Sequence, residues 1–391
     1  MSEENGLLAA GLLALLILLP SSSCLAANIH VGSLDIHPYV TVSAGHTDNV
    51  FLTRTNEESD TFYLISPGIK VFLPIQRHSF NLDYTVDSYI YKERDEADRT
   101  IHNVTGTADL NPSTKLNLQL RNTFSRSADI PDFMNDRTSP FIWNRSSFEG
   151  AYDVTSRLAF GVDYQHGTKR YDRTEDRIDD YDENGVSGRV YYKVLPKTSL
   201  LIFYQYSVKD YEKRRPEDND AHRVEGGVTW KIGLKSLGTA RVGYMRTDYD
   251  DINRTDEALS YFVNLTHELR PKTILALEGL REILDTSNAD DNLAFSNSYV
   301  STQIAGTVSH GYRKFTGRLK AGYIWDEYLH DDLAVGRERR DNLFSAEVGI
   351  DYALRKWFNL GGSYRFSRLD SNNDPEEYEE NTYLFYLSLI L

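Results

Sequence analysis

Apolar and polar residues alternate one by one along most of this chain. Between residues 115 and 121, leucine occupies every second position and alternates with Asn117, Gln119 and Arg121. The segments 157–165 and 315–325 repeat the pattern, with aromatic and aliphatic residues on one set of positions. Because successive side chains of a β-strand point to opposite faces, this period of two predicts strands with one apolar and one polar face.

The alternating segments are long, and the connections between them alternate in length. A strand of a globular protein has about 5–6 residues, whereas a strand that crosses a bilayer at a tilt needs about 9–11, which these segments reach. Short connections, as at 154–157 and 270–273, alternate with long charged ones, as at 53–60 and 209–221. The pattern predicts an all-β protein, a single transmembrane antiparallel up-and-down β-barrel of about 18 strands, with about 16 as the alternative count. Expected strands start, among other places, near Thr61, Leu259 and Leu343.

A soluble β-sandwich or propeller is the competing interpretation. It predicts strands of about 5–6 residues and turns every 8–12 residues or so. It also predicts no systematic alternation between short and long connections. The pattern along the chain favours the membrane barrel on each of these points.

The first 27 residues are typical of a signal peptide. An apolar run from Leu7 to Leu19 is followed by Pro20 and by small residues up to Ala27, and the run is too short to span a bilayer comfortably. The absence of Lys or Arg before this run departs from the usual pattern. We therefore expect three parts: a signal peptide (1–27), a short periplasmic segment (28–35) and an outer-membrane barrel (36–391). An export signal with no later apolar run long enough for a membrane helix indicates the bacterial outer membrane.

Composition excludes several classes of protein. The formal net charge of −15 argues against a nucleic-acid partner, because phosphates demand a basic surface. The only cysteine, Cys24, lies in the expected signal peptide, so no disulfide, thiol nucleophile or thiolate metal site is expected in the mature chain. We expect no cofactor and no metal site.

Charged residues out of phase with the apolar stripe are the candidates for the barrel interior. A charge on the lipid face costs about 2–4 kcal/mol near the membrane midplane, so these residues should point inward. A barrel of this size is wide enough for an aqueous channel. Two interpretations stay open: a polar path for a hydrophilic solute, or Arg–Glu pairs that only fill and stiffen the interior. The predicted lumen-lining residues are Arg121, Glu149, Asp163, Arg189, Lys193, Arg223, Glu225, Arg241, Glu278, Arg318, Lys320, Glu347, Asp351 and Arg365.

Aromatic residues are abundant near the expected strand ends and on the outward stripe. Tyr63, Tyr89, Tyr91 and Tyr164 are among them. We expect them to form girdles at the two membrane interfaces. Platforms on which sugar rings stack are the alternative role.

The chain ends on an apolar strip in which every second residue is large and apolar. In water such a strand would promote aggregation, whereas in a closed barrel its apolar face meets lipid. The strip is the expected recognition signal for the barrel-assembly machinery, and outer-membrane lipid and lipopolysaccharide are the other expected partners. Many outer-membrane barrels end on Phe, and this chain departs from that pattern. The residues of the predicted signal are Tyr383, Phe385, Leu387, Leu389 and Leu391.

Catalytic motifs are absent from the sequence. The ten histidines are scattered, and no Gly-x-Ser-x-Gly, His-Glu-x-x-His or phosphate-loop motif occurs. We therefore predict no catalytic residues and no enzyme activity. The alternative is a Ser/His pair that meets across strands, as in a barrel lipase.

Two segments near the start of the expected barrel resemble a known family. The segment "HPYVTVSAGHTDNVFLT" followed by "SDTFYLISPGIKV" is similar to the opening of the putative beta-barrel porin 2 family, and residues 102–127 are similar to that family's second hairpin and third upstroke. The resemblance implies an outer-membrane barrel encoded beside exopolysaccharide genes, a role in passage or export of polysaccharide, and polysaccharide-export components as partners. The matching positions are Pro38, Tyr39, Asp48, Asn49, Phe51, Ser66, Pro67 and Gly68.

The first functional hypothesis is therefore an outer-membrane channel that exports exopolysaccharide through a polar lumen of mixed charge. A general diffusion porin for small hydrophilic solutes is the nearest alternative. An outer-membrane enzyme, or a structural or adhesive barrel whose acidic loops meet partners outside the cell, are alternatives of a different class.

Overall fold

The computed structural model describes residues 29–129, 138–213, 217–232, 235–285, 298–332 and 336–390. These contain nineteen strands and four short 3-10 helices, and no α-helix. The strands are β1 (Ile29–Val31), β2 (Leu34–Thr47), β3 (Asp60–Ile75), β4 (His78–Tyr91), β5 (Arg99–Leu110), β6 (Leu116–Asp129), β7 (Ser139–Asp153), β8 (Leu158–Tyr171), β9 (Tyr181–Leu195), β10 (Thr198–Tyr211), β11 (Asn219–Ile232), β12 (Ser236–Tyr249), β13 (Arg254–Arg270), β14 (Thr273–Asp285), β15 (Ser298–Tyr312), β16 (Phe315–Asp332), β17 (Arg337–Arg355), β18 (Phe358–Ser371) and β19 (Tyr378–Ile390). The 3-10 helices are η1 (Asp95–Ala97), η2 (Asp176–Asp179), η4 (Asp250–Ile252) and η5 (Asp374–Glu376).

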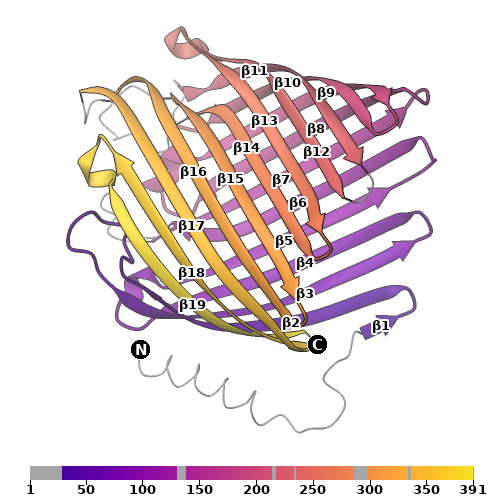
Figure 1. Cartoon of the computed structure of the whole chain (residues 1–391). Helices are drawn as coiled ribbons and strands as arrows, with labels where there is room; N and C mark the ends of the chain where they lie inside the picture. Colours follow the sequence, from indigo (N-terminus) through magenta and orange to yellow (C-terminus); the bar gives the residue numbers. More distant parts are fainter. Residues whose placement is uncertain are drawn as a thin grey trace.

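Strands β2 to β19 form one closed ring. Each pairs antiparallel with its neighbours in the sequence, and β19 pairs with β2 to close the ring (Figure 1). β1 is an additional short strand that pairs only with the start of β2. The prediction of a single 18-stranded antiparallel up-and-down barrel is confirmed, and the alternative of a smaller count is wrong. Within the described ranges, no helix is long and apolar enough to span a membrane.

The connections divide the barrel into two ends. Short turns such as 196–197 and 271–272 join strands at one end, which we call the short-turn end. Most connections at the other end, the long-loop end, are longer, and all four 3-10 helices of the described residues lie at that end. In barrels of this kind the short turns are periplasmic and the long loops extracellular.

The two faces of each strand differ sharply. On β10, Leu200 and Ile202 are 52% and 63% exposed, whereas Leu201 and Phe203 between them are 3% and 7% exposed. The exposed residues belong to an apolar outer belt that continues around the ring, as alternation along the sequence predicted. In the last strand, Tyr383, Phe385 and Leu387 are on this outer face, and Leu389 follows in the same phase. Leu391, the last residue of the predicted assembly signal, lies outside the described residues.

The N-terminal boundaries are described only in part. The expected signal peptide (1–27) lies outside the described residues. Within the expected periplasmic segment (28–35), β1 and a turn at Gly32, whose φ is +65°, form a hairpin that leads into β2 at Leu34. Glycine suits this turn because it adopts a positive φ without steric cost.

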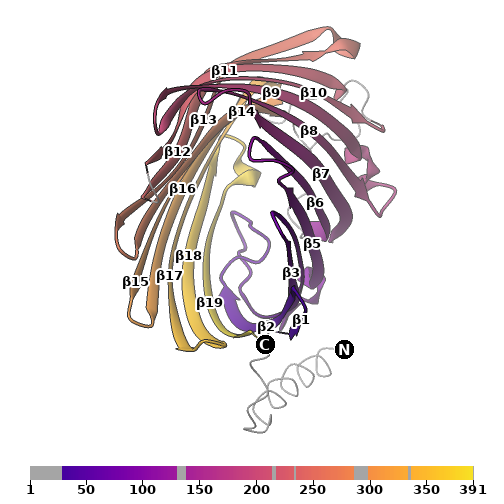
Figure 2. The same cartoon turned by 90° about the vertical axis from the view of Figure 1, so that its right-hand side faces the viewer.

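The barrel is elongated in cross-section, with a narrow end at β11 and β12 (Figure 2). A Cβ atom at Gly227 or Gly243 would collide with the backbone of the neighbouring strand. Both glycines lie on the inner face, opposite Arg241 and Glu225 respectively. The absence of a side chain therefore allows the two strands to approach closely where the sheet bends. We call the inner surface of β10–β13 the packed corner, because Leu201, Phe203, Glu225, Met245 and Tyr249 are all buried there.

The seam between β13 and β14 is not paired along its whole length. The ladder between β13 and β14 stops at Tyr261 and Arg281, although both strands continue towards the long-loop end. There, Met245 and Ala258 on the inner face of β12 and β13 pack against Ile283 and Val300 on the outer face of β14 and β15. The strand tips therefore overlap instead of hydrogen-bonding edge to edge.

Polar contacts hold this overlapping seam together. The Asp285 carboxylate accepts hydrogen bonds from Tyr249 Oη (2.6 Å) and Lys209 Nζ (3.2 Å). Asp256 accepts one from the hydroxyl of Ser298 and contacts His330 Nε2 at 2.8 Å. Hydrogen bonds to an ionised carboxylate are stronger than those between neutral groups. The contacts of Asp285 and Asp256 therefore hold the overlapping strand tips together.

Candidate functional site in the barrel lumen

The strand register places all fourteen predicted lumen residues on the inner face of the ring. Glu149 lies opposite Asp163, Arg241 opposite Phe262, and Glu347 opposite both Lys320 and Arg365. Each is out of phase with the exposed apolar belt. Position on the inner face is a condition for contact with a solute, and the role of these residues as a solute path stays a prediction.

One group of these residues forms ion pairs along the wall made by β7, β8 and β9. Arg189 contacts the carboxylate of Asp163 and lies 3.4 Å from Glu149 Oε2. Asp163 also accepts a hydrogen bond from Ser187. These partly exposed contacts cross three strands, and a cavity of about 230 Å³ opens beside them. The wall here is polar, of mixed sign and open to the lumen.

A second group is enclosed in the packed corner. The Arg241 guanidinium lies 4.2 Å from the ring centroid of Phe203 and 4.5 Å from that of Phe262. Its Nε is 3.1 Å from Glu225 Oε2, and the Glu225 side chain is fully buried. A pair removed from water in this way cannot meet a passing solute, so for Glu225 and Arg241 the filling and stiffening interpretation fits the structure.

A third group lies on the wall of β16–β19. Arg318 pairs with Asp351 at 3.0 Å, and the Tyr386 hydroxyl donates to the same carboxylate. Arg365 pairs with Glu380 at 3.1 Å. These side chains line cavities of about 400 and 360 Å³ that open into the lumen.

Arg223 pairs with Glu282 on β14 at 3.0 Å. The other five predicted residues keep their charges unpaired. Within the part of the chain that the structure describes, the structure records no ion pair for these five side chains, so water and solute can bind them. They are Arg121, Lys193, Glu278, Lys320 and Glu347.

Three aromatic rings on the inner wall lie over glycines of neighbouring strands. A Cβ atom added at Gly68, Gly361 or Gly45 would collide with the ring of Tyr39, Tyr386 or Phe62 respectively. The Tyr39 hydroxyl also hydrogen-bonds to Thr85 and Asp83 on β4. The Pro-Tyr segment supplies the ring of Tyr39, and the Ser-Pro-Gly segment supplies Gly68, the glycine over which this ring lies. The two segments therefore act together to place the ring against the wall.

The connection between β2 and β3 folds inward into the long-loop end of the lumen (Figure 2). Asn49 is fully buried, and its side-chain amide donates to Thr53 O (2.7 Å) and Glu379 O (2.9 Å). Asp48 accepts hydrogen bonds from the backbone and the side chain of Asn381 on β19. The Asp48-Asn49 pair thus ties this inward loop to the last strand.

The inward loop is also held by its charged residues. Arg54 pairs with Asp374 at 2.8 Å and with Glu377 at 3.2 Å, in the connection between β18 and β19. Glu58 pairs with Arg94, in the connection between β4 and β5, at 2.8 Å. Anchored on both sides, the loop forms a fixed wall for the 360 Å³ cavity. The sequence pattern did not reveal that it folds inward.

Of four aromatic residues expected at the membrane interfaces, two lie on the outer face of the barrel and two on the inner face. Tyr63 and Tyr164 are on the exposed outer face, as a membrane girdle requires. Tyr89 and Tyr91 are on the inner face and line the 360 Å³ cavity. The expectation that these two contact lipid is wrong, and their phase could have shown this, because they are in step with the inward Asp87.

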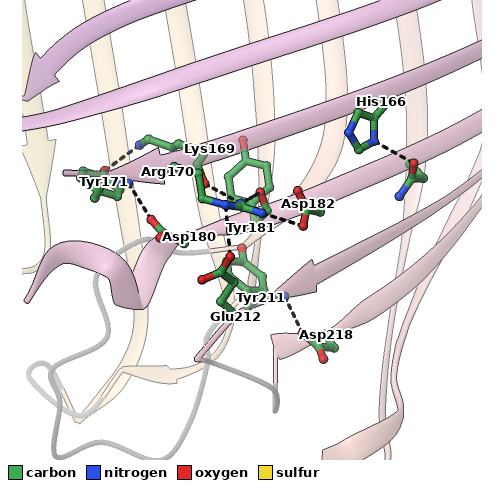
Figure 3. Close-up of polar contacts among 11 residues, drawn as sticks. His166, Lys169, Arg170, Tyr171, Asp180, Tyr181, Asp182, Tyr211, Glu212 and Asp218 are labelled. Atoms are coloured by element: carbon green, nitrogen blue, oxygen red, sulfur yellow. Dashed lines mark hydrogen bonds and ion pairs between the residues drawn. The ribbon is translucent and has the colours of Figure 1, made fainter. Parts of the chain in front are cut away.

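Polar contacts also order the strand ends beside the long loops (Figure 3). Arg170 donates to Asp182 at 2.7 Å and pairs with Glu212 at 3.2 Å. Asp180 and Asp218 each accept a hydrogen bond from the backbone amide of a strand-terminal tyrosine, Tyr171 (2.7 Å) and Tyr211 (2.6 Å). Burial raises the pKa of Asp180, and the hydrogen bond from Tyr171 opposes this shift. These contacts fix the base of each loop.

The described residues bring one Ser, one Asp and one His together, but not in a catalytic order. Ser298 and His330 both contact Asp256, which lies between them. A nucleophilic serine needs the imidazole within hydrogen-bond reach of its hydroxyl, whereas Ser298 donates to the carboxylate. Among the described residues no cluster of three or more His, Cys, Asp or Glu could hold a metal ion.

Solved structures similar to this chain are outer-membrane barrels. OccK2 (OpdF) of Pseudomonas aeruginosa is 11% identical, with 92% of this chain and 99% of that chain covered and a TM-score of 0.50. The outer membrane protein opdK of Pseudomonas aeruginosa is 11% identical, with 91% and 99% covered and a TM-score of 0.48. The copper transporter OprC is 10% identical, with a TM-score of 0.45. The match covers 90% of this chain and 64% of OprC, so this chain spans less than two thirds of that protein's length. At such identities the likeness shows the fold alone.

No curated protein sequence matches the chain. The sequence itself is matched by a family profile, and the match includes nearly all of the barrel. The resemblance seen in the opening segments is thereby confirmed, and a porin-like barrel of the outer-membrane type is what the family and the fold both indicate. The family described as Putative beta-barrel porin 2 matches residues 25–389, and the chain belongs to that family.

Proposed function

We propose that the barrel is a passive outer-membrane channel for saccharide chains, and that its cargo is exopolysaccharide leaving the cell. The observation that carries this proposal is the composition of the inner wall. Paired charges of both signs alternate with tyrosines whose rings lie along the wall, as Tyr39 and Tyr386 do. Such a wall offers many hydrogen bonds and aromatic surfaces without a strong field of one sign, which suits a polyhydroxylated chain.

The unpaired lumen residues supply the contacts that a moving chain needs. Arg121, Lys193 and Lys320 offer N–H donors, and Glu278 and Glu347 offer acceptors. Sugar hydroxyls can exchange hydrogen bonds between such groups and water at little net cost, because a typical hydrogen bond contributes only about 0.5–1.5 kcal/mol net. Transport is then passive, and its direction comes from synthesis on the inner side.

The proposal includes three kinds of partner: the assembly machinery, the surrounding lipid and the export components. The barrel-assembly machinery would recognise the apolar stripe of the last strand, Tyr383 to Leu389. The outer belt would contact lipid and lipopolysaccharide, and export components would deliver the polysaccharide at the short-turn end.

Two measurements test the proposal. In a planar bilayer the purified barrel should conduct ions, and a long oligosaccharide added to one side should interrupt the current. A strain that lacks the gene should retain less polysaccharide outside the cell and more in the periplasm. Normal surface polysaccharide in that strain would refute export.

A general diffusion porin is the second candidate, favoured by the unpaired charges that face an open lumen. It predicts that liposomes containing the barrel swell at rates set by solute size alone. Preference for a saccharide over a neutral polyol of equal size would separate the two functions. Lipid hydrolysis by the purified protein, lost on replacement of Ser298 or His330, would instead favour the enzyme alternative.

A further inference from the structure

The cavity behind the inward loop has features that the channel function does not require. It has a volume of about 360 Å³, within the range of small-molecule sites, roughly 300–1,000 Å³. Val50 and Leu52 of the inward loop close it on one side. The inner faces of β3–β5 and of β17–β19 close it on the others. We call it the mouth cavity, and it lies where a solute would enter or leave the lumen.

Arg99 is the distinctive residue of the mouth cavity. Its guanidinium lies 4.3 Å from the ring centroid of Tyr89, so the ring supports it from one side. Its one hydrogen bond in the described residues goes to the carbonyl of Ala97 at 3.3 Å, and no carboxylate of those residues pairs with it. A guanidinium has five N–H donors in a planar fork, so most of the donors of Arg99 remain available.

The facing wall adds a second guanidinium and two acceptors. Arg365 is about half exposed and uses one nitrogen to contact Glu380. Glu380 is already held by Thr47 (3.1 Å) and Thr382 (2.8 Å). Glu347 lies opposite Arg365 in the ladder, and both line the cavity.

Aromatic residues complete the lining. Phe62 contacts Tyr89 and Tyr91, with ring centroids 5.9 and 5.5 Å apart. All three rings line the mouth cavity. Rings of this kind pack against the apolar C–H face of a sugar, while charged and amide groups bind its hydroxyls.

We propose that the mouth cavity is a binding subsite for an acidic sugar residue. The carboxylate of the sugar binds the fork of Arg99, its ring packs beside Tyr89 and Tyr91, and Glu347 accepts its hydroxyls. The fork of an arginine matches a carboxylate in a bidentate geometry, which makes this the strongest contact available in the cavity. The inference rests on the proposed saccharide channel and names one class of its cargo, a polysaccharide that contains uronate residues.

The test compares two sugars that differ only in charge. Folded barrel in detergent is titrated calorimetrically with a β-1,4-linked glucuronate tetrasaccharide and with its carboxyl-reduced counterpart. The wild-type barrel should bind the acidic sugar about tenfold more tightly or better, and added salt should weaken this preference. Equal binding of the two sugars, or binding of neither, would overturn the proposal.

The variants locate the preference. Arg99→Gln should lower affinity for the acidic sugar about tenfold and leave affinity for the reduced sugar unchanged, because only the carboxylate loses its partner. Arg99→Lys keeps the charge and should retain part of the preference. Arg368→Gln is the matched control, because Arg368 lies on β18 like Arg365 but pairs with Asp370 on the outer face. An undiminished preference in Arg99→Gln would place the acidic-sugar site elsewhere and refute the proposal.

The result does not depend on transport. A barrel that binds the acidic sugar but exports nothing would refute the channel function and support the subsite. A barrel that exports polysaccharide but binds the two sugars equally would support the channel function and refute the subsite. Heat-dependent mobility on a denaturing gel confirms that each variant is folded.

Discussion

The packed corner and the open wall of this barrel use the same residue types for different purposes. In the packed corner, Arg241 and Glu225 form a pair enclosed by two phenylalanine rings. On the open wall of β16–β19, Arg318 and Asp351 form a pair of similar length, but both side chains remain partly exposed to the lumen. Charge pairs in the corner therefore maintain shape, whereas those on the wall can exchange their partner for water or solute. The difference shows that inward orientation alone does not make a residue part of a solute path.

The largest effect should come from glycines at the sharp bend. Gly243→Val should prevent folding, because a Cβ there collides with the backbone of β11 and no side-chain rotation relieves the clash. Gly188→Val is the control, since a Cβ at this position of β9 meets no atom within 4 Å. The yield of heat-modifiable, folded barrel measures both. Normal folding of Gly243→Val would show that the sheet does not bend as described.

The second comparison concerns the two charge pairs. Glu225→Gln should lower the free energy of unfolding by about 3–5 kcal/mol, because it leaves a buried guanidinium without its charge partner. Arg318→Gln should cost about 1 kcal/mol or less, since the pair with Asp351 is partly hydrated.

Urea unfolding followed by tryptophan fluorescence in lipid vesicles measures both differences. Equal losses in the two variants would mean that the corner and the wall do not differ in hydration.

A smaller and local effect is expected at the overlapping seam. Asp285→Asn should weaken the contacts with Lys209 and Tyr249 that hold the tips of β14 and β15 under β12 and β13. Hydrogen exchange of the backbone amides at 282–285 should rise about tenfold or more, from the loss of charged hydrogen bonds, while global unfolding changes little. Asp370→Asn, which alters an exposed pair on the outer face, is the control. Unchanged exchange at the tips would remove the role assigned to Asp285.

The smallest effect should appear as a pH dependence at the long-loop end. The pKa of Asp180 is raised from its ordinary value of 3.8, chiefly by burial. A group with a raised folded-state pKa contributes stability that is complete below pH 3.8 and is lost as the pH rises through the folded-state pKa.

Protection of the loop 172–180 from exchange should therefore increase slightly on acidification, and Asp180→Asn should remove that dependence. A loop that loosens on acidification in the wild type, with no change in Asp180→Asn, would contradict the sign of this effect.

Sequence periodicity predicted the strands better than it predicted their ends. The strands expected near Leu259 and Leu343 begin at Arg254 and Arg337, five and six residues earlier. The additional residues are mainly charged and lie beyond the apolar belt, where alternation carries no hydrophobic signal. The inward position of Arg189 and Asp163 could be predicted from the sequence, because both are out of phase with the apolar residues of their strands. The burial of Glu225 could not, because it depends on the close approach of β11 and β12 at Gly227 and Gly243, where the sheet bends.

The closed barrel, its apolar outer belt and the set of side chains that face inward could all be predicted from the local pattern of residues. These follow from a two-residue period and from the cost of placing charges in lipid, which act strand by strand. The elongated cross-section, the overlapping seam, the inward loop and the mouth cavity could not be predicted in this way. Those features depend on contacts between residues far apart in the chain, such as Asp48 with Asn381 and Asp285 with Lys209, and a local pattern contains no information about which distant partner a side chain meets.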